Sequence, residues 1–456
     1  MAFQTLTSLT AESIMRGTYP RIIVRLRRPG RSLFPLLGFI AVAIGCRDVT
    51  PPPATSMPDT PKRQLVTVGF DLAEVETGSY STCGLDRFGK AYCWGQDFFG
   101  QLGNGNGGAQ NELVPVAVAP PEGTSALLEF TTISVGYSHA CAVARGGQVY
   151  CWGSSTTGQV GAGEGGSGVQ YGVPTPVSTA VLFSDVSAGQ FHSCALDKTG
   201  RAYCWGANHA GQLGAGVFGP STCVNDVPCN PFPRAVAPPL GSSEPLTFVA
   251  ISAGSAFTCG IAKGGQVFCW GDDEYGQLGI GSTDGADQLR PTPIASALLF
   301  TAVSAGADHA CALAKGGALW CWGRNFFGEV GDGTTDETSV PVPVVGGYAF
   351  TDLSAGLPYD GDEVRTCAIA KGGKAYCWGD NLGGRLGVGF ASQFEAVPVP
   401  VAGGFTFTSI TAGMVHGCGV TKSSGAYCWG GNYEGQLGTG SFTSYAAPVP
   451  VSAPAP

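Results

Sequence analysis

Cysteine is the residue whose type and spacing point most directly to chemistry in this chain. The sequence holds 17 cysteines, and in seven pairs the second cysteine follows the first by ten residues and is itself followed by Trp-Gly. The pairs are Cys83 and Cys93, Cys141 and Cys151, Cys194 and Cys204, Cys259 and Cys269, Cys311 and Cys321, Cys367 and Cys377, and Cys418 and Cys428. Thiols at a regular spacing can form disulfides or bind a metal ion.

The residues between the paired cysteines favour a β-hairpin closed by a disulfide. They are rich in strand formers, and in six copies a glycine stands six positions after the first cysteine, where a three-residue loop needs a positive φ. A loop closed between Ala144 and Gln148 places the two cysteines opposite each other. Directly opposed strand residues have Cα atoms about 4.5–5.5 Å apart, within reach of a disulfide. In the seventh copy the sequence is Ser424-Gly425, so a different turn is expected there.

Zinc binding is the alternative use of paired cysteines. Zinc sites have closer spacing and clustered ligands, and one pair across a hairpin does not supply four ligands. We therefore predict seven hairpin disulfides and an eighth, between Cys223 and Cys229, inside an insertion. Cys46 is then left over. Disulfides persist in oxidising compartments, so we expect the folded part to lie beyond the reducing cytosol.

Residues 1–45 have the composition of an export signal. They hold six arginines and one glutamate, and the apolar run Leu33–Ile44 is too short to span a bilayer as a helix. Small residues directly before Cys46 resemble a bacterial lipoprotein cleavage box, so we predict lipid on Cys46; a membrane anchor with an unmodified cysteine is the alternative. The long basic segment leaves open whether the first methionine or Met15 is the true start. Residues 46–64, rich in proline and polar residues, are typical of an extended tether.

Strand alternation within each copy predicts a sheet that is covered on both faces. In Tyr150-Cys151-Trp152 the cysteine points to one face and both aromatic rings to the other, and both faces are apolar. Seven radially arranged four-stranded sheets satisfy this requirement, since each blade covers its neighbours, and about 50 residues is the length of one blade. We therefore predict an all-β fold, with a seven-bladed β-propeller at residues 65–452 and a short tail at 453–456.

The repeats resemble those of the regulator of chromosome condensation family. The resemblance is carried by runs such as ISAGSAFTCGIAKGGQVFCWGDDEYGQLG, in seven in-phase copies from about Leu65 to Val451. It implies a seven-bladed β-propeller. The best-known eukaryotic member exchanges guanine nucleotide on a small nuclear GTPase, and other members are secreted bacterial proteins that bind and inhibit β-lactamases through a propeller face. The second cysteine of every copy departs from the nuclear type.

Few residues are arranged for catalysis. Four histidines, His139, His192, His309 and His416, stand two residues before the first cysteine of their copies, and a residue repeated at one position usually serves the fold. No nucleophile motif such as Gly-x-Ser-x-Gly is present. We therefore expect a protein that is not an enzyme and needs no cofactor.

One insertion carries acidic residues of the type that calcium prefers. Asp360, Asp362 and Glu363 lie in the sixth copy, between Gly356 and Cys367. Three acids in one loop are more often only solvated. No metal site is predicted, although calcium stays an open alternative.

Binding is the function class that the repeats favour. Each copy has two variable residues before its Gly-Gln-Leu-Gly turn, and equivalent residues of a propeller fall on one rim. The aromatic and histidine residues among them are Phe98, Phe99, His209, Tyr275, Phe326, Phe327 and Tyr433. Aromatic side chains commonly anchor protein interfaces, so we expect an unknown protein partner at this rim. Packing against the turn of the next blade is the alternative role of these side chains.

The charge balance argues against nucleic acid. The chain carries a net charge of −9, its leader is basic, and no basic stripe is expected in the remainder. We expect a monomeric, non-enzymatic protein-binding scaffold of the bacterial cell envelope, attached to the membrane through the lipid on Cys46 alone and facing the periplasm or exterior. The alternatives are a regulator resembling a guanine-nucleotide exchange factor, which follows from the family resemblance, and a propeller enzyme such as a lyase or hydrolase.

Overall fold

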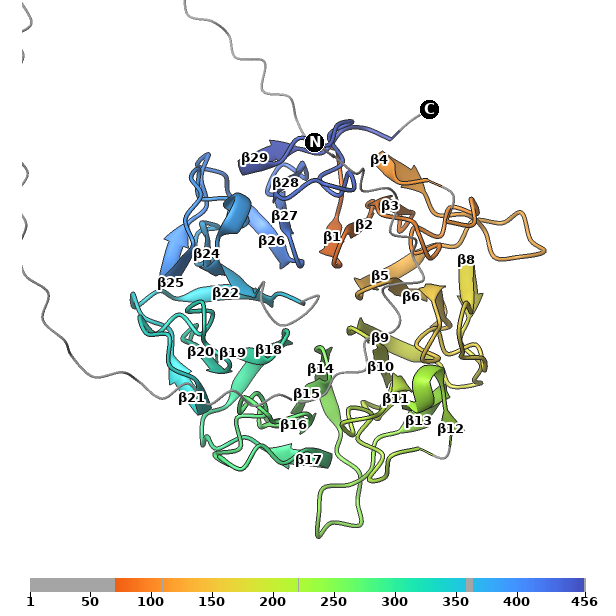
Figure 1. Cartoon of the computed structure of the whole chain (residues 1–456), viewed down its shortest axis with the longest axis vertical. Helices are drawn as coiled ribbons and strands as arrows, with labels where there is room; N and C mark the ends of the chain where they lie inside the picture. The colour runs from red at the N-terminus through yellow and green to blue at the C-terminus, as the bar shows by residue number, and fades with distance from the viewer. Residues whose placement is uncertain (1–69, 109, 220, 358–363, 455–456) are drawn as a thin grey trace, which may run out of the picture. The chain divides into compact units, whose positions relative to one another are not determined.

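The computed structural model describes residues 70–108, 110–219, 221–357 and 364–454, which form a seven-bladed β-propeller (Figure 1). Each blade is an antiparallel sheet built from consecutive strands, and the first strand of each blade lies nearest the central axis. The predicted fold class is confirmed. None of the helices in these ranges has the length and hydropathy needed to cross a bilayer.

The strands of the blades have the following bounds. Blade 1 contains β1 (Glu74–Thr77), β2 (Ser81–Leu85), β3 (Ala91–Gly95) and β4 (Glu112–Ala117), and blade 2 contains β5 (Phe130–Val135), β6 (His139–Ala144), β7 (Val149–Ser154) and β8 (Gln170–Pro176). Blade 3 contains β9 (Phe183–Ala188), β10 (His192–Asp197), β11 (Ala202–Ala207) and β13 (Pro228–Ala235), with β12 (Ser221–Thr222) added outside β13. Blade 4 contains β14 (Phe248–Ala253), β15 (Phe257–Ala262), β16 (Val267–Gly271) and β17 (Gln288–Pro293).

The remaining three blades follow the same plan. Blade 5 contains β18 (Phe300–Ala305), β19 (His309–Ala314), β20 (Leu319–Gly323) and β21 (Thr338–Pro343). Blade 6 contains β22 (Phe350–Ala355), β23 (Arg365–Ala370), β24 (Ala375–Asp380) and β25 (Phe394–Pro400), and blade 7 contains β26 (Phe407–Ala412), β27 (His416–Thr421), β28 (Ala426–Gly430) and β29 (Tyr445–Pro450). Two short 3₁₀ helices, Val224–Asp226 and Leu382–Gly384, stand between strands.

The middle two strands of every blade form a disulfide-linked hairpin. In blade 2, Cys141 pairs directly with Cys151, and the loop closes with a bond from Ala144 N–H to the Gln148 carbonyl oxygen (2.8 Å). All seven ten-residue pairs are disulfides, with Cα atoms 4.0–4.1 Å apart, slightly closer than expected. Cys223 and Cys229 form the eighth, in the insertion of blade 3.

The hairpin of blade 7 has the turn of blades 1 and 3, in which only the third loop residue has a positive φ, whereas blades 2, 4, 5 and 6 have a positive φ at the second loop residue as well. The expectation that the turn of blade 7 differs from all the others is therefore wrong. Ser424 N–H donates to the Thr421 carbonyl oxygen (2.8 Å), as Gly147 N–H donates to that of Ala144 (2.9 Å) in blade 2. Ser424 has a φ of 64°, where Gly147 has 101°. The pairing of the strands therefore holds a non-glycine residue in the left-handed region, which costs conformational energy.

The hydrophobic core lies between adjacent blades. The disulfide of Cys83 and Cys93 in blade 1 shares a buried cluster with Phe130 and Trp152 of blade 2. The clusters between later blades repeat this arrangement, with a disulfide on one side and the tryptophan of the next blade on the other. The sulfur face of each sheet therefore packs against the aromatic face of its neighbour.

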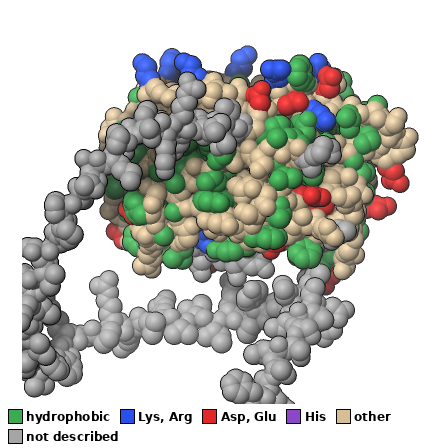
Figure 2. Space-filling model, turned by 90° about the horizontal axis from the view of Figure 1, so that it is seen from above, with side chains coloured by type: hydrophobic (Ala, Val, Ile, Leu, Met, Phe, Trp, Pro, Cys, Tyr) green, Lys and Arg blue, Asp and Glu red, His purple; other side chains and the backbone are tan. Residues whose placement is uncertain are grey.

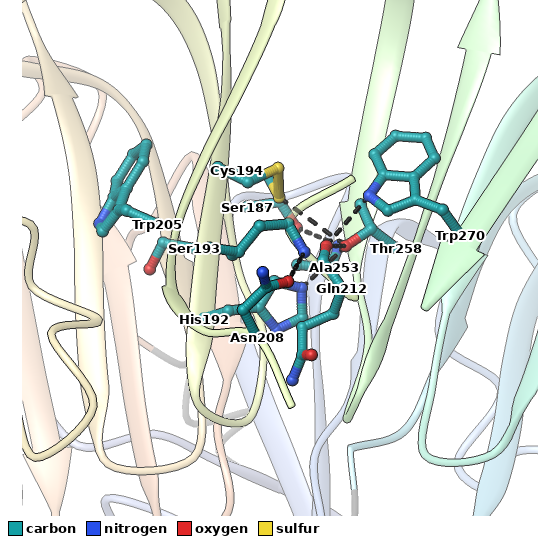
Figure 3. Close-up of a disulfide and its surroundings, with 12 residues drawn as sticks. Ser187, His192, Ser193, Cys194, Trp205, Asn208, Gln212, Ala253, Thr258 and Trp270 are labelled. Atoms are coloured by element: carbon teal, nitrogen blue, oxygen red, sulfur yellow. Dashed lines mark hydrogen bonds between the residues drawn. A yellow bond between two sulfur atoms is a disulfide. The ribbon is translucent and has the colours of Figure 1, made fainter. Parts of the chain in front are cut away.

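The Trp-Gly motif of one blade contacts the Gly-Gln-Leu-Gly motif of the preceding blade. We call this contact the joint between blades. Trp270 Nε1 of blade 4 donates to the Gln212 carbonyl oxygen of blade 3 (3.0 Å; Figure 3). Gly214, two residues after Gln212, lies against the same ring, since a Cβ atom there would be 2.6 Å from Trp270 Nε1. Six of the seven Trp-Gly tryptophans make this bond, the exception being Trp429, which finds no acceptor in the described ranges.

The repeated histidines strengthen the same joint. His192 Nε2 of blade 3 lies 2.8 Å from Thr258 Oγ1 of blade 4, and this hydroxyl donates to the Gln212 carbonyl oxygen (2.9 Å; Figure 3). Because a carbonyl oxygen only accepts, the hydroxyl proton is committed to Gln212, and His192 Nε2–H must donate to the hydroxyl. This bond places a proton on Nε2, and burial, which lowers the pKa of His192 to about 3, keeps the imidazole neutral.

The hydroxyl is present only where the preceding blade supplies histidine. His416, His139, His192 and His309 face Thr82, Ser193, Thr258 and Thr366, respectively. Ser81, Phe257 and Arg365 replace histidine in the other blades, and the following blades have Ala140, Ala310 and Gly417 at the hydroxyl position. The histidines therefore serve blade packing.

Some of the expectations concern residues outside the described ranges. These are the export signal at 1–45, the lipid on Cys46, the tether at 46–64, and calcium binding by Asp360, Asp362 and Glu363. They stay predictions.

Replacement of Ser424 by glycine should stabilise the propeller. Glycine adopts a positive φ without the steric cost of a Cβ atom, so we expect a gain of about 0.5–1 kcal/mol after the greater entropy of the unfolded chain is allowed for. The reverse change, Gly317→Ser at a φ of 97°, should destabilise it. Thermal unfolding followed by circular dichroism measures both, and a lower melting temperature for Ser424→Gly would contradict this account of the turn.

Replacement of His139 by phenylalanine, the residue that Phe257 supplies in blade 4, should flatten the acid dependence of stability. Burial lowers the pKa of His139 from 6.5 to about 3. Between these values the unfolded chain takes up a proton that the native state refuses, so stability falls with falling pH by about 1.4 kcal/mol per pH unit for each such histidine.

The measurement is thermal unfolding of wild type and His139→Phe from neutral to acidic pH. The buried carboxyl groups with raised pKa values act in the opposite direction, but they are common to both proteins and cancel in the difference. Phe257→Leu is the control, because it disturbs the same position without removing a titrating group. Identical pH profiles for His139→Phe and wild type would show that the histidine is not buried in its neutral form.

Candidate functional site

The antiparallel order gives the propeller two chemically different faces. The turn between the two disulfide-linked strands lies at one edge of each blade, and the turn after Trp-Gly lies at the opposite edge, because one strand joins them. We call the first surface the hairpin face, formed by residues 86–90, 145–148, 197–201, 263–266, 315–318, 371–374 and 422–425. We call the second the turn face, formed by the turns that follow Trp-Gly and by those between the first two strands of each blade.

Two buried polar side chains shape the turn after Trp-Gly in blades 1, 3, 4, 5 and 7, whereas blades 2 and 6 keep one of the two bonds, through Gln159 and Asn381 respectively. In blade 1, Asp97 Oδ1 accepts from Leu102 N–H (3.0 Å) and Gln101 Oε1 accepts from Phe99 N–H (2.8 Å). The same two bonds recur in blade 4 through Asp273 and Gln277. The turn is therefore fixed from within, and the two variable residues are held outward at defined positions.

The structure places the predicted rim residues together on the turn face but exposes them unequally. The first variable residue is exposed in six blades, as shown by exposed fractions of 64% for Phe98, 48% for Phe326 and 59% for Tyr433. His209 is exposed as well, whereas Tyr275 and Phe327 are half-buried. Packing against the neighbouring turn therefore accounts for Tyr275 and Phe327, which stand second in their pairs of variable residues. The first residue of the pair faces solvent in six blades.

Arg324 joins part of the rim into one cluster. Its guanidinium carbon lies 4.7 Å from the ring centre of Phe326, 5.8 Å from that of Tyr275 and 6.0 Å from that of Phe327. The rings of Tyr275 and Phe326 meet edge to face at 6.0 Å, across the junction of blades 4 and 5. Arg324 is only 3% exposed, so the cation supports the rings from below.

Carboxyl groups hold Arg324 in this place. Asp308 Oδ2 lies 3.7 Å from Arg324 Nη1, and Glu329 occupies the position where most blades have glutamine. Burial raises the pKa of Asp308 to about 6 and that of Glu329 to about 7, while the charge of Arg324 opposes both shifts. Arg324 was not among the residues predicted from the sequence. The features that could have indicated it are a charged residue directly after Trp-Gly and a glutamate where most copies have glutamine.

Carboxyl groups also line the axial side of the inner strands, and none of them was among the predicted site residues. Burial raises the pKa of Glu74 to about 7 and that of Glu76 well above its ordinary value, and the pKa values of Asp185 and Asp352 are also raised by burial. Asp352 Oδ2 accepts from Ile410 N–H of the next blade (3.2 Å). Within the described residues no group of three or more His, Cys, Asp or Glu side chains could hold a metal ion.

The hairpin face is basic, which corrects the expectation that no basic surface exists. Every hairpin carries Lys or Arg, and together they hold ten of the fifteen Lys and Arg residues between positions 70 and 454. These residues are Arg87, Lys90, Arg145, Lys198, Arg201, Lys263, Lys315, Lys371, Lys374 and Lys422. The basic residues of successive hairpins are about 50 positions apart in the sequence, so only the closure of the ring brings them onto one face. Figure 2 shows Lys and Arg side chains along one edge of the disc.

Known proteins share this repeat and this fold. A family model described as the RCC1-like domain matches residues 42–357, and a model of the regulator of chromosome condensation (RCC1) repeat matches residues 424–455. The ultraviolet-B receptor UVR8 of Arabidopsis thaliana is 26% identical over 353 residues, which cover 76% of this chain and 74% of the receptor. The E3 ubiquitin-protein ligase HERC2 of Homo sapiens is 29% identical over 383 residues, which cover 80% of this chain but only 7% of the ligase.

A solved structure agrees with the fold. Prp20p of Saccharomyces cerevisiae superposes with a TM-score of 0.61 at 22% sequence identity, covering 75% of this chain and 80% of that chain. The repeats, the blade count and the family match lead to one assignment: the chain belongs to the regulator of chromosome condensation (RCC1) repeat family.

Proposed function

We propose that this propeller is a non-enzymatic protein-binding scaffold of the cell envelope, and that the aromatic rim of its turn face contacts the partner. The observation that carries the proposal is the exposure of Phe98, Phe326 and Tyr433 on turns that are rigid from within. Aromatic side chains on an ordered backbone lose little conformational entropy on binding, which suits them as anchors.

The relatives support a binding role for the fold. The solved structure of Prp20p is described together with its binding to Gsp1p and histones, and another describes yeast Prp20 bound to Kap60. These are partners of those proteins. They support the general inference that a propeller of this family takes a protein partner.

The scaffold role accounts for the polar groups better than an enzyme does. The buried histidines bond the next blade, and Asp352 bonds a backbone N–H of blade 7. A lyase or hydrolase needs a base or nucleophile free to reach substrate. The axial carboxyl groups are the observation that would favour the enzyme, and their bonds to strands and hydroxyls favour a packing role.

The disulfides support placement outside the cytosol. Eight disulfides would be hard to form and keep in a reducing compartment. We propose that residues 1–45 export the chain and that Cys46 carries the lipid that retains it at the membrane. This location also argues against an exchange factor for a cytoplasmic GTPase.

Changing Phe98, Phe326 and Tyr433 to alanine should remove the partner. Interface anchors of this type each contribute about 2 kcal/mol, so we expect capture to fall by at least about tenfold. The tagged chain is used to capture proteins from the native envelope, and each co-purified protein is quantified by mass spectrometry. Phe88→Ala, at a residue 61% exposed on the hairpin face, is the matched control. Recovery of the same proteins in equal amounts by the triple variant would refute the rim as the binding surface.

Changing Cys46 to alanine should release the protein from the membrane. In a bacterial host supplied with an alkyne-tagged fatty acid, we expect label on the wild-type chain and none on Cys46→Ala, because only the cysteine thiol accepts the lipid. Fractionation in a high-salt buffer, which screens contacts between basic side chains and lipid headgroups, should move the variant out of the membrane pellet. Equal labelling of both chains, or a cytoplasmic position for a reporter fused after Val451, would count against the proposed location, and the second result would favour the exchange-factor alternative.

A further inference from the structure

Seven basic side chains of the hairpin face lie at equivalent positions, four residues after the first cysteine of each blade, and all seven are exposed. Each occupies the turn between the disulfide-linked strands, and Lys263, Lys315, Lys371 and Lys422 occupy the same position in blades 4 to 7. Each turn also meets the start of the next blade, as where Phe300 N–H donates to the Gly265 carbonyl oxygen (2.8 Å). Equivalent blades set the tips at one level, as the side view of the disc shows (Figure 2).

The charge is least compensated over blades 4 to 7. In blades 1 and 2 a tip cation has a carboxylate nearby, with Arg87 3.9 Å from Asp71 and Arg145 2.9 Å from Glu129. From Lys263 onward, the hairpins contain no Asp or Glu, and neither do the segments 294–299, 344–349 and 401–406, which lead into blades 5, 6 and 7. The segment that leads from blade 7 into blade 1 holds one acid, Asp71, which pairs with Gly425 of the blade 7 hairpin. This part of the face therefore has a positive potential on a protein that is acidic overall.

Apolar side chains stand among the cations. Phe88 is 61% exposed within the hairpin of blade 1, and Val249 and Leu299 are exposed where the inner strands of blades 4 and 5 begin. Leu299 is next to the hairpin tip of blade 4, since a Cβ atom at Gly265 would lie 3.1 Å from its Cβ. Exposed apolar groups on the same face as lysines suit a surface with both a charged layer and an apolar interior.

The chain enters the propeller at this same face. Leu72 N–H donates to the Ser424 carbonyl oxygen (3.0 Å), and Ala426 N–H donates to that of Phe70 (2.9 Å), so the first described residue lies beside the hairpin of blade 7.

We propose that the hairpin face docks on an anionic lipid surface, with the lysines of blades 4 to 7 at the headgroups and Phe88, Val249 and Leu299 entering the layer beneath them. Nucleic acid would also attract the lysines, but it offers no apolar layer, and its phosphates need a continuous track of cations. The tips here form a ring, and exposed apolar side chains lie at the tip of blade 1 and at the starts of blades 4 and 5. A membrane therefore fits both features of the face.

The test uses the full chain as Cys46→Ser, so that no lipid is attached and failure of the proposed anchor has no effect on the result. Binding is measured by sedimentation with vesicles of equal parts phosphatidylglycerol and phosphatidylcholine, and with pure phosphatidylcholine vesicles. Every variant keeps the same first 64 residues, so their own membrane affinity cancels in the comparison.

The informative variant changes Lys263, Lys315, Lys371 and Lys422 to glutamine. Each cation at an anionic surface contributes a factor of about five, and with screening we expect an overall loss of at least about tenfold on the anionic vesicles. The four Lys→Arg changes should restore binding to within about twofold, because charge rather than side-chain shape attracts the headgroups. Glu274→Gln with Glu337→Gln, which removes negative charge from the turn face, should leave binding unchanged.

Three results would overturn the proposal. They are equal vesicle binding by the glutamine variant and its parent, equal binding of the parent to both kinds of vesicle, and binding to duplex DNA that the glutamine variant loses while vesicle binding is absent. Thermal unfolding of each variant accompanies the test. The four lysines are exposed, so their replacement should leave the melting temperature unchanged.

Discussion

The joint between neighbouring blades is the interaction on which the rest of this propeller depends. A tryptophan indole donates to a carbonyl oxygen of the preceding blade, and a glycine two residues later lets the ring come close, as with Trp270, Gln212 and Gly214. The carbonyl oxygen belongs to the turn that carries the variable residues, so the contact that closes the ring also fixes the rim. Stability and the presentation of the binding surface therefore have the same physical origin.

The joints between blades are alike where their side chains are neutral, and they differ from one another where a charged side chain takes part. Histidine and a hydroxyl complete four of the joints, and burial keeps these imidazoles neutral. In blades 5 and 6, Glu329 and Arg385 replace the repeated glutamine, and Arg385 pairs with Asp380 inside its turn. A buried charge needs a partner, so each replacement recruits another charged residue. The Arg324 cluster beneath Phe326 is one product of this departure from the repeat.

Because the disulfides, the tryptophans and the histidines all act in the interior, the two faces are free to differ. The turn face bears exposed aromatic side chains supported by a buried cation, and the hairpin face bears lysines interspersed with apolar side chains. A disc with these two faces can meet two different surfaces at once.

Much of this protein could be predicted from the sequence because its key interactions are local. The hairpin, its disulfide and the polar residue that shapes each turn involve residues within about a dozen positions, and seven copies imply a closed ring. Even there, the loop at Ser424 kept its shape against the preference of its sequence, since the paired strands on both sides outweigh the cost of a positive φ at one residue.

The tertiary structure decided what depends on residues from different blades. The match between His192 and Thr258, the cluster of Tyr275 with Arg324 and Phe326, and the ring of lysines each join positions about 50 residues apart in the chain. A lysine in one repeat looks like an ordinary solvated side chain. Seven turns at one level make a charged face, because the closure of the ring adds their electrostatic potentials, and the sequence of any single repeat contains no information about that sum.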